Sequence, residues 1–354
     1  MQPKSKSFLY KLLSTPSPTG FEQRIQRLVS NHMRPYADLI EGDLHGNLIV
    51  ALNPKAKRKI MLAGHCDQIG FMVKHISDEG FIWVAPLGGV DAGVLYGAAV
   101  TIHAKSGPIG GVIGRKPIHL QKKEERNRLE TELDKIWIDI GAKDKKEAAK
   151  LIEIGDAVTF EAGVRDFLNE CIVSPGMDDR VGLFVAMETV RLLARTKLAV
   201  GLYAVSTVQE EVGLRGAMTS AFGIEPEVGI AIDVTHASDN PGNDDKKQAT
   251  CKVGSGPTIS RGPTVNPIVE KKLIAAAKKA KVPYQIAPAA TLLGNDARAI
   301  QVSRAGVATG SIGIPNRYMH TQAELCSLKD IENAAKLLAT FVRDISAKTS
   351  FKPF

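Results

Sequence analysis

The segment "LAVGLYAVSTVQEEVG", residues 198–213, decides how the fold of this chain is read. From Leu198 to Val208 the segment has no charged residue and is rich in apolar and small residues. This is typical of a strand buried in a parallel sheet. Glu210 and Glu211 follow almost at once. Uncompensated carboxylates at the edge of a core are costly. Either this is an ordinary solvated loop, or a positive group meets the two glutamates there.

The composition of the whole chain is that of a globular protein. It has 354 residues, of which 44% are hydrophobic and 24% charged, enough for one large domain or two smaller ones. No run approaches about 18 apolar residues, so we expect no membrane-spanning helix, no signal peptide and no membrane partner. The cysteines are scattered without a CxxC pair, which indicates free thiols and a cytoplasmic location: Cys66, Cys171, Cys251 and Cys326.

The net charge of +8 raises the question of nucleic-acid binding. The basic residues are spread along the chain, in segments such as "KKEER" and "KKLIAAAKKAK", and aromatic residues are not interleaved with them. No nucleic-acid recognition motif is present in the sequence. We therefore expect a solvated basic surface and no nucleic-acid partner.

Two kinds of sequence pattern occur along the chain. Residues 71–163 hold short β-type runs separated by Gly, Pro and Asp, among them "FMVKHI", "AAVTIHA" and "IWIDIG", which predict a small barrel-like module. Its charged stretch, residues 119–135, is predicted to be a mobile loop or a short exposed helix. Outside it, strands alternate with helices, as in "AVGLYAVSTV" and "LKDIENAAKLLATFVRDIS". This predicts a three-layer α/β/α domain, residues 1–70 and 165–354, with a β-rich domain, residues 71–164, inserted into it.

Metal-competent side chains gather where the predicted strands end or helices begin. Ligands in open α/β sheets bind at the carboxyl ends of the strands. Taken singly, each such residue is more often a helix cap, a turn or a surface pair. Because all of them fall at one edge of the sheet, together they predict a shared site: His65, Asp67, Asp178, Asp179, Glu210, Glu211, Asp233 with His236 nearby, and His320.

Imidazoles and carboxylates are ligands suited to Zn²⁺, Co²⁺ or Mn²⁺. Five strand ends or helix starts each supply at least one such group. Five ligands exceed what one Zn²⁺ needs and suit two ions roughly 3.5–4 Å apart. One carboxylate must then bridge the ions, and an unligated one can accept the proton of a water. Glu210 and Glu211 can divide these tasks, because neighbours on an extended chain point in different directions.

The motifs that carry these residues resemble those of the family 42 metallo-aminopeptidases. This family includes glutamyl and tetrahedral aminopeptidases and proteins labelled endoglucanase M. The resemblance covers nearly the whole chain, inserted domain included, and its motifs occur in the family's order: "AGHCDQIGFMV", "VIGRKPIHL", "GMDDRVG", "STVQEEVGLRGA", "AIDVTHASDNPG" and "GNDARAIQVSRAGVATGSIGIPNRYMHTQAE".

The resemblance implies an α/β two-metal exopeptidase domain with an inserted PDZ-like domain. It also implies two divalent ions per subunit, Zn²⁺ or Co²⁺, with Mn²⁺ as a further candidate. One ion would be held by His65 and Asp233 and the other by Glu211 and His320. Asp178 would bridge them.

The resemblance further implies that Glu210 is the general base and that Asp67 orients His65. Related enzymes carry a cis peptide at the position of Asp178–Asp179. The expected reaction removes the N-terminal residue from peptides with a free N-terminus. The family also forms tetrahedral dodecamers in which the inserted, apical domain takes part in assembly. The charged loop at Lys122–Arg128 would then line an interior passage.

Some positions depart from the family or stay outside the predicted site. Gln68 stands where many relatives have Glu, and Asn295 replaces a commoner Thr, but neither change removes a predicted ligand. Cys66 is predicted to be a small buried filler. Structural or surface roles are predicted for His75, His103, His119 and His236, and the acidic loop residues Asp239, Asp244 and Asp245 are candidates for shaping the specificity pocket.

Three other functions stay open at this stage. The first is an N-acyl-amino-acid deacylase or carboxypeptidase, which would share the two-metal core. The second is a metal-independent glycosidase using paired carboxylates. The third is a non-catalytic peptide-binding shell. The sequence leaves undetermined the preferred N-terminal residue, the native metal, and whether a dodecamer or a smaller dimer is the working state.

Overall fold

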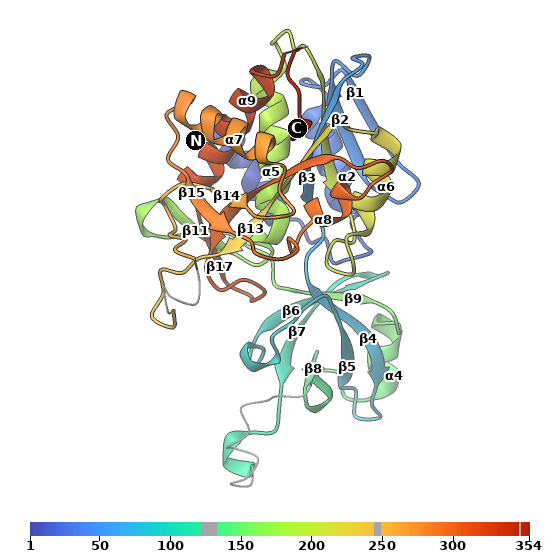
Figure 1. The fold of residues 1–354 in the computed structure, drawn as a ribbon. Helices are drawn as coiled ribbons and strands as arrows, with labels where there is room; N and C mark the ends of the chain where they lie inside the picture. Colours follow the sequence, from blue (N-terminus) through green and yellow to red (C-terminus); the bar gives the residue numbers. More distant parts are fainter. Residues whose placement is uncertain (122–132, 244–248, 347) are drawn as a thin grey trace.

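The computed structural model describes residues 1–121, 133–243, 249–346 and 348–354. A large sheet runs through the upper lobe in Figure 1, with the strand order β1-β2-β12-β3-β13-β16-β14-β15. Its strands are β1 (Leu39–Gly42), β2 (Leu48–Leu52), β3 (Lys59–His65), β12 (Gly201–Thr207), β13 (Val228–His236), β14 (Thr258–Arg261), β15 (Gln285–Pro288) and β16 (Ala308–Asn316).

The centre of this sheet is parallel and its flanks are mixed. β3 pairs in parallel with β12 and β13, and β13 pairs in parallel with β16. Antiparallel pairing joins β2 to β12, β1 to β2, and β14 to β16. All seven residues of β12 are buried, which explains why its sequence is uncharged. The segment that precedes the two glutamates is therefore an interior strand, as predicted.

Helices cover both faces of the sheet and give the predicted three layers. Along β3, the side chains of Ile60 and Leu62 belong to one hydrophobic cluster and those of Met61 and Ala63 to another, because successive residues point to opposite faces. The first cluster includes residues of α1 (Pro3–Leu13), α2 (Gln23–Met33), α5 (Met177–Leu193), α7 (Pro267–Lys279) and α9 (Leu328–Arg343). The second includes residues of α6 (Arg215–Ile224) and α8 (Ala297–Gln301).

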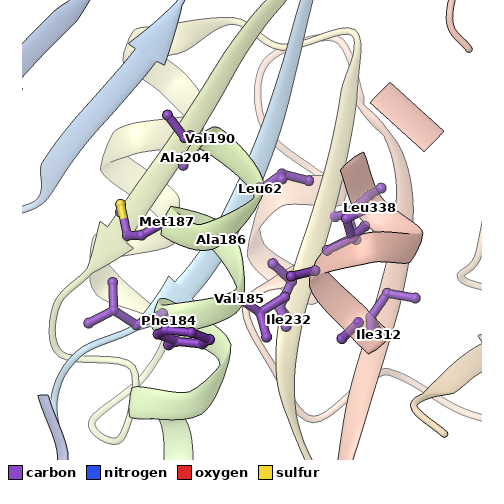
Figure 2. Close-up of a cluster of buried hydrophobic side chains, with 14 of the residues drawn as sticks. Leu62, Phe184, Val185, Ala186, Met187, Val190, Ala204, Ile232, Ile312 and Leu338 are labelled. Carbon is purple, nitrogen blue, oxygen red and sulfur yellow. The ribbon is translucent and has the colours of Figure 1, made fainter. Parts of the chain in front are cut away.

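Helix α5 lies at the centre of the larger cluster. Figure 2 shows Phe184, Val185 and Met187 of this helix among side chains from the sheet and from α9. Nearly all of α5 is buried, including its first turn. The position of that first turn, which carries Asp178, is thus fixed by a helix that is buried along nearly its whole length.

Arg180, in the same turn, is completely buried. Burial lowers the pKa of its guanidinium to about 10. Its guanidinium donates hydrogen bonds to main-chain oxygens at the end of α1 and at the start of α5. A cation at the C-terminal end of α1 also interacts favourably with the dipole of that helix. These acceptors are the carbonyls of Leu12, Leu13, Thr15, Pro175 and Gly176.

Replacing Arg180 with methionine should lower the free energy of unfolding by at least about 3 kcal/mol, because several buried carbonyls lose their donor at once. Denaturant titration of the purified protein measures the change. Arg261→Met is the control, since that side chain is 55% exposed beside Glu270 and should change stability by less than about 0.5 kcal/mol. Equal losses in the two variants would contradict this role for Arg180.

The lower lobe in Figure 1 is a closed barrel, with the strand order β4-β5-β8-β7-β6-β9. It has its own hydrophobic cluster, in which the rings of Phe71 and Phe160 pack edge to face. Residues 122–132 of the predicted charged stretch, including the whole Lys122–Arg128 loop, lie outside the described residues. The barrel elements are β4 (Gly70–Ile76), β5 (Ile82–Leu87), β6 (Ala99–Ala104), β7 (Gly107–Gly114), β8 (Trp137–Asp139), α4 (Lys145–Leu151) and β9 (Ala157–Phe160).

A small antiparallel sheet joins the chain before α5 to the chain before α9. It has the order β10-β11-β17, from β10 (Arg165–Asp166), β11 (Cys171–Ser174) and β17 (Glu324–Ser327). In this pairing Glu324 lies opposite Ser174, a few residues before the start of α5. No helix in the described parts of the chain has the length and apolar character needed to cross a membrane.

Candidate metal centre

The predicted site residues meet at the carboxyl ends of the central strands. His65 is the last residue of β3, Glu210 and Glu211 follow β12, and Asp233 lies in the C-terminal half of β13. Parallel neighbours end at one edge of a sheet, so these side chains converge there. Asp178 enters from the first turn of α5 and His320 from the loop between β16 and β17.

Asp178 occupies the middle of the group. Its Oδ1 lies 3.1 Å from Nε2 of His65, and its Oδ2 lies 3.1 Å from Nε2 of His320. Each carboxylate oxygen thus faces a different imidazole. Two sets of candidate ligand atoms, each within 4.8 Å of one another, share this residue: His65, Asp178 and Asp233, and Asp178, Glu211 and His320.

The start of α5 separates the two aspartates that the sequence places side by side. Neither has helical dihedral angles, and the peptide bond between them is cis. Asp179 turns away from the imidazoles. Its Oδ1 accepts a hydrogen bond from the backbone N–H of Gly182, and its Oδ2 accepts one from that of His65. The Asp179 carboxylate therefore joins the first turn of α5 to the end of β3, whereas that of Asp178 faces both histidines.

Asp67 holds the turn that carries the two glutamates. Its carboxylate is fully buried and accepts hydrogen bonds from the backbone N–H groups of Glu210 and Glu211, at 3.1 and 3.2 Å, and from the hydroxyl of Thr19. Nδ1 of His65 lies 3.0 Å from the Asp67 backbone oxygen and 3.3 Å from Oδ1. Asp67 thus contacts the imidazole, as the resemblance implies, and also fixes the Glu210–Glu211 backbone.

Burial makes ionised carboxylates costly in this group. It raises the pKa of Glu210 and of Glu211 to about 8, and that of Asp233 well above its usual range. Burial also opposes ionisation of Asp178, but hydrogen bonds from His320 and His65 outweigh it and lower the pKa of that carboxyl. The hydrogen bond with Asp178 raises the pKa of His320 to about 9.

These properties fit a pair of divalent cations. Oε1 of Glu211 is buried without a hydrogen-bond partner, although it lies 3.7 Å from Nε2 of His320. A buried acidic cluster must either take up protons or be compensated by positive charge, and bound cations would keep these carboxylates ionised. Carboxylate and imidazole donors are those that Zn²⁺, Co²⁺ and Mn²⁺ accept.

Two buried acidic residues near the centre were not predicted. Glu324 accepts hydrogen bonds from the backbone N–H groups of Asp178 and His320, and burial raises its pKa to about 8. Asp296 accepts a hydrogen bond from the hydroxyl of Thr207, and burial raises its pKa to about 6. The signals in the sequence were an acid four residues after His320, in "HTQAE", and the acid in "GNDA".

A cavity of about 590 Å³ opens beside the candidate ligands. Its wall includes Asp178, Glu210, Glu211, Asp233 and His320. Beyond these, the described lining residues include no acidic side chain, and their only guanidinium is that of Arg298; the rest of the wall comes mainly from Thr235, His236, Thr258, Ser260, Ala287, Ala289, Leu293, Asn295 and Ser311.

The barrel also reaches the centre. A Cβ on Gly88 would lie 3.1 Å from Oε2 of Glu211, and one on Gly89 would lie 3.2 Å from Nδ1 of His320. Gly88 has a φ of +79°, which favours glycine. The loop after β5 thus packs its backbone directly against two candidate ligands.

The residues predicted to lie outside the site have varied surroundings. His236 is exposed, and it also lines the cavity beside the candidate ligands. His103 bonds to the hydroxyl of Thr159, and His75 and His119 are exposed. Cys66 is fully buried, consistent with a filler.

Of the three acidic residues in the loop after β13, only Asp239 is among the described residues. Asp239 forms a bidentate pair with Arg317, at 2.9 and 2.6 Å, and is not among the cavity-lining residues. Asp244 and Asp245 lie outside the described residues. Of the two departures from the family, Gln68 is buried beside Ser17, and Asn295 bonds to Ser311 in the cavity wall.

An α/β sheet with clustered imidazoles and carboxylates at its strand ends is the architecture of a metal-dependent hydrolase. The family model for M42 glutamyl aminopeptidase matches residues 46–337. The chain belongs to this family, whose members are metallopeptidases that hydrolyse peptide bonds.

Individual relatives agree with this assignment. The lysyl aminopeptidase of Pyrococcus furiosus is 35% identical, over 95% of this chain and 96% of its own length. The solved TET aminopeptidase of a marine sediment thaumarchaeon has a TM-score of 0.93 at 32% identity, covering 98% of each chain. The TET1 peptidase of Pyrococcus horikoshii, described as assembling into a tetrahedron or an octahedral shell, has a TM-score of 0.85 at 29% identity, covering 96% of this chain and all of its own.

Proposed function

We propose that this chain is a two-metal aminopeptidase that releases the N-terminal residue of peptides with a free N-terminus. The observation that carries the proposal is the position of Asp178, whose two oxygens face two separate groups of candidate ligands. Asp178 would bridge the ions. His65 and Asp233 would complete one site, and Glu211 and His320 the other.

Two divalent ions at these positions, Zn²⁺ or Co²⁺ with Mn²⁺ as a further candidate, would supply Lewis acidity for a water and for the scissile carbonyl. Glu210 belongs to neither ligand group among the described residues and lines the cavity. It takes the proton that the water loses as its oxygen bonds to the carbonyl carbon. It then passes this proton to the leaving amine as the C–N bond breaks.

Asp67 supports both the general base and the metal ligands, mainly through hydrogen bonds to the main chain. Its carboxylate accepts hydrogen bonds from the backbone N–H groups of Glu210 and Glu211, and so fixes the base and one ligand relative to each other. It also contacts Nδ1 of His65, which favours the tautomer whose Nε2 is available as a ligand.

The test of this function is metal-dependent hydrolysis of aminoacyl-p-nitroanilides by chelated and then reconstituted protein. Activity should vanish with the chelator and return with Co²⁺ or Zn²⁺. N-acetylated amino acids should not be cleaved, which separates an aminopeptidase from a deacylase. Chelator-insensitive cleavage of a glucan would instead support the glycosidase, and absence of any turnover with two bound ions would support the peptide-binding shell.

The cavity predicts which N-terminal residues are accepted. Its described wall offers Arg298 and neutral groups but no acid beyond the candidate ligands, so glutamyl substrates should be cleaved in preference to lysyl ones. Arg298→Glu should raise the lysyl-to-glutamyl ratio of kcat/KM by about tenfold or more. Arg304→Glu is the control, since Arg304 pairs with Glu225 and does not line the cavity. A wild-type preference for lysine would contradict this account.

We also propose a homo-oligomeric working state, a tetrahedral dodecamer. The support is the overall likeness to the TET1 peptidase, which assembles into shells. The barrel, residues 71–164 in the proposed division, would be the apical domain used in assembly, and residues 1–70 and 165–354 the catalytic domain. Light scattering on purified protein distinguishes the dodecamer from a dimer.

A cytoplasmic location is part of the same proposal. The four cysteines are free thiols in the structure, and three of them are buried. Unpaired cysteines are typical of proteins from reducing compartments.

A further inference from the structure

Glu324 is a buried carboxylate that the proposed reaction does not use. It is the first residue of β17 and only 1% exposed. Pairing between β17 and β11 places it under the loop that leads into α5. The residue is therefore held by strand pairing, independently of the candidate ligands.

The two oxygens of Glu324 contact two different candidate ligands through their main chains. Oε2 accepts the backbone N–H of Asp178 at 3.0 Å, and Oε1 accepts that of His320 at 2.9 Å. Both distances lie within the ordinary range for a hydrogen bond from a backbone N–H to an oxygen. One carboxylate thus fixes the separation between a helix start and a loop that are remote in sequence.

Both contacted segments have unusual backbone conformations. His320 has a φ of 62° and Tyr318 a φ of 64°, in the left-handed region that non-glycine residues seldom adopt. Asp178 has non-helical dihedral angles within the first turn of α5. Such conformations persist where the surroundings determine them, and the bonds from Glu324 act on both.

We propose that Glu324 is a positioning residue that sets the affinity of one of the two metal sites, the one formed by Asp178, Glu211 and His320. This inference rests on the proposed two-metal function. Glu324 acts on two of the three ligands of that site. The other set shares Asp178, but Glu324 contacts neither of its remaining members, His65 and Asp233. The backbone N–H of His65 is held by Asp179 instead.

The alternative is that Glu324 only stabilises the fold. Asp330 provides a matched comparison, because it is a fully buried carboxylate whose oxygens accept the backbone N–H groups of Gly254 and Gly256, at 2.6 and 2.8 Å. Neither glycine belongs to a candidate ligand group. Replacing either acid by its amide turns one acceptor oxygen into a donor that opposes an N–H.

The experiment is titration of Co²⁺ into the metal-free full-length protein, followed by calorimetry and by the visible absorption of bound Co²⁺. Glu324→Gln should weaken the binding of one ion by about 10–100-fold and that of the other by a clearly smaller factor, because only Asp178 of the second set contacts Glu324. Activity should recover at saturating Co²⁺, because the base is intact. Asp330→Asn should lower Tm without changing either affinity.

The proposal is overturned if Glu324→Gln binds both ions as the wild type does, weakens both equally, or behaves like Asp330→Asn. If Glu324→Gln does not fold, Glu324→Asp replaces it. This side chain keeps the carboxyl group but is too short to reach both N–H groups, so it should show the same selective loss. A wild-type protein that binds a single ion would refute the two-metal function itself, which is a distinguishable result.

Discussion

Glu210→Gln should lower kcat by about 10²–10⁴-fold while the protein keeps its full complement of metal. The glutamine has the same shape but cannot accept the proton of the attacking water. Glu210 stands outside both candidate ligand groups, with Oε2 3.9 Å from Nε2 of His65. The measurements are kcat on an aminoacyl-p-nitroanilide and bound metal by elemental analysis, made on the same sample.

Glu211→Gln is the matched control, since it makes the same change on the adjacent residue. Glu211 belongs to the group with Asp178 and His320, so this variant should lose affinity for one ion first. Added metal should restore part of its activity, whereas no metal concentration should restore Glu210→Gln. If the two variants lost metal and activity in the same proportions, the division of roles between the glutamates would be wrong.

Asp178→Asn should reduce bound metal to below about one ion per chain and abolish turnover, because in the proposed two-metal site this carboxylate would serve both ions. An amide offers one weak acceptor oxygen where the carboxylate offers two charged ones. Metal content after reconstitution and equilibrium dialysis measures the loss. Tm of the metal-free protein shows whether the fold is intact.

Asp179→Asn tests whether that loss is specific. Asp179 is adjacent and also buried, but its oxygens accept hydrogen bonds from the backbone N–H groups of His65 and Gly182. This variant should lose stability and keep most of its metal. Loss of both ions from Asp179→Asn, with retention in Asp178→Asn, would reverse the roles of the two aspartates.

The architecture of the α/β lobe could be predicted because its signals are local. The uncharged strand before Glu210 and the alternation of strands with helices both follow from burial of the chain segments themselves. Helix α1 was not predicted, although its buried apolar residues, Phe8, Leu9, Leu12 and Leu13, have helical spacing. Its position depends on packing in the cluster around α5 and on the hydrogen bond from the buried Arg180 to the Leu12 carbonyl. These contacts come from distant parts of the sequence.

The sequence by itself determined which residue types arrive at the strand ends, because strand direction and side-chain chemistry are encoded residue by residue. Only the tertiary structure decided how they face one another: Asp178 toward both imidazoles, Asp179 toward the helix backbone, and Glu210 outside the two ligand groups. Glu324 escaped prediction for the same reason. Its contacts with Asp178 and His320 depend on strand pairing between β11 and β17, and a pairing between remote segments leaves no periodic pattern in either of them.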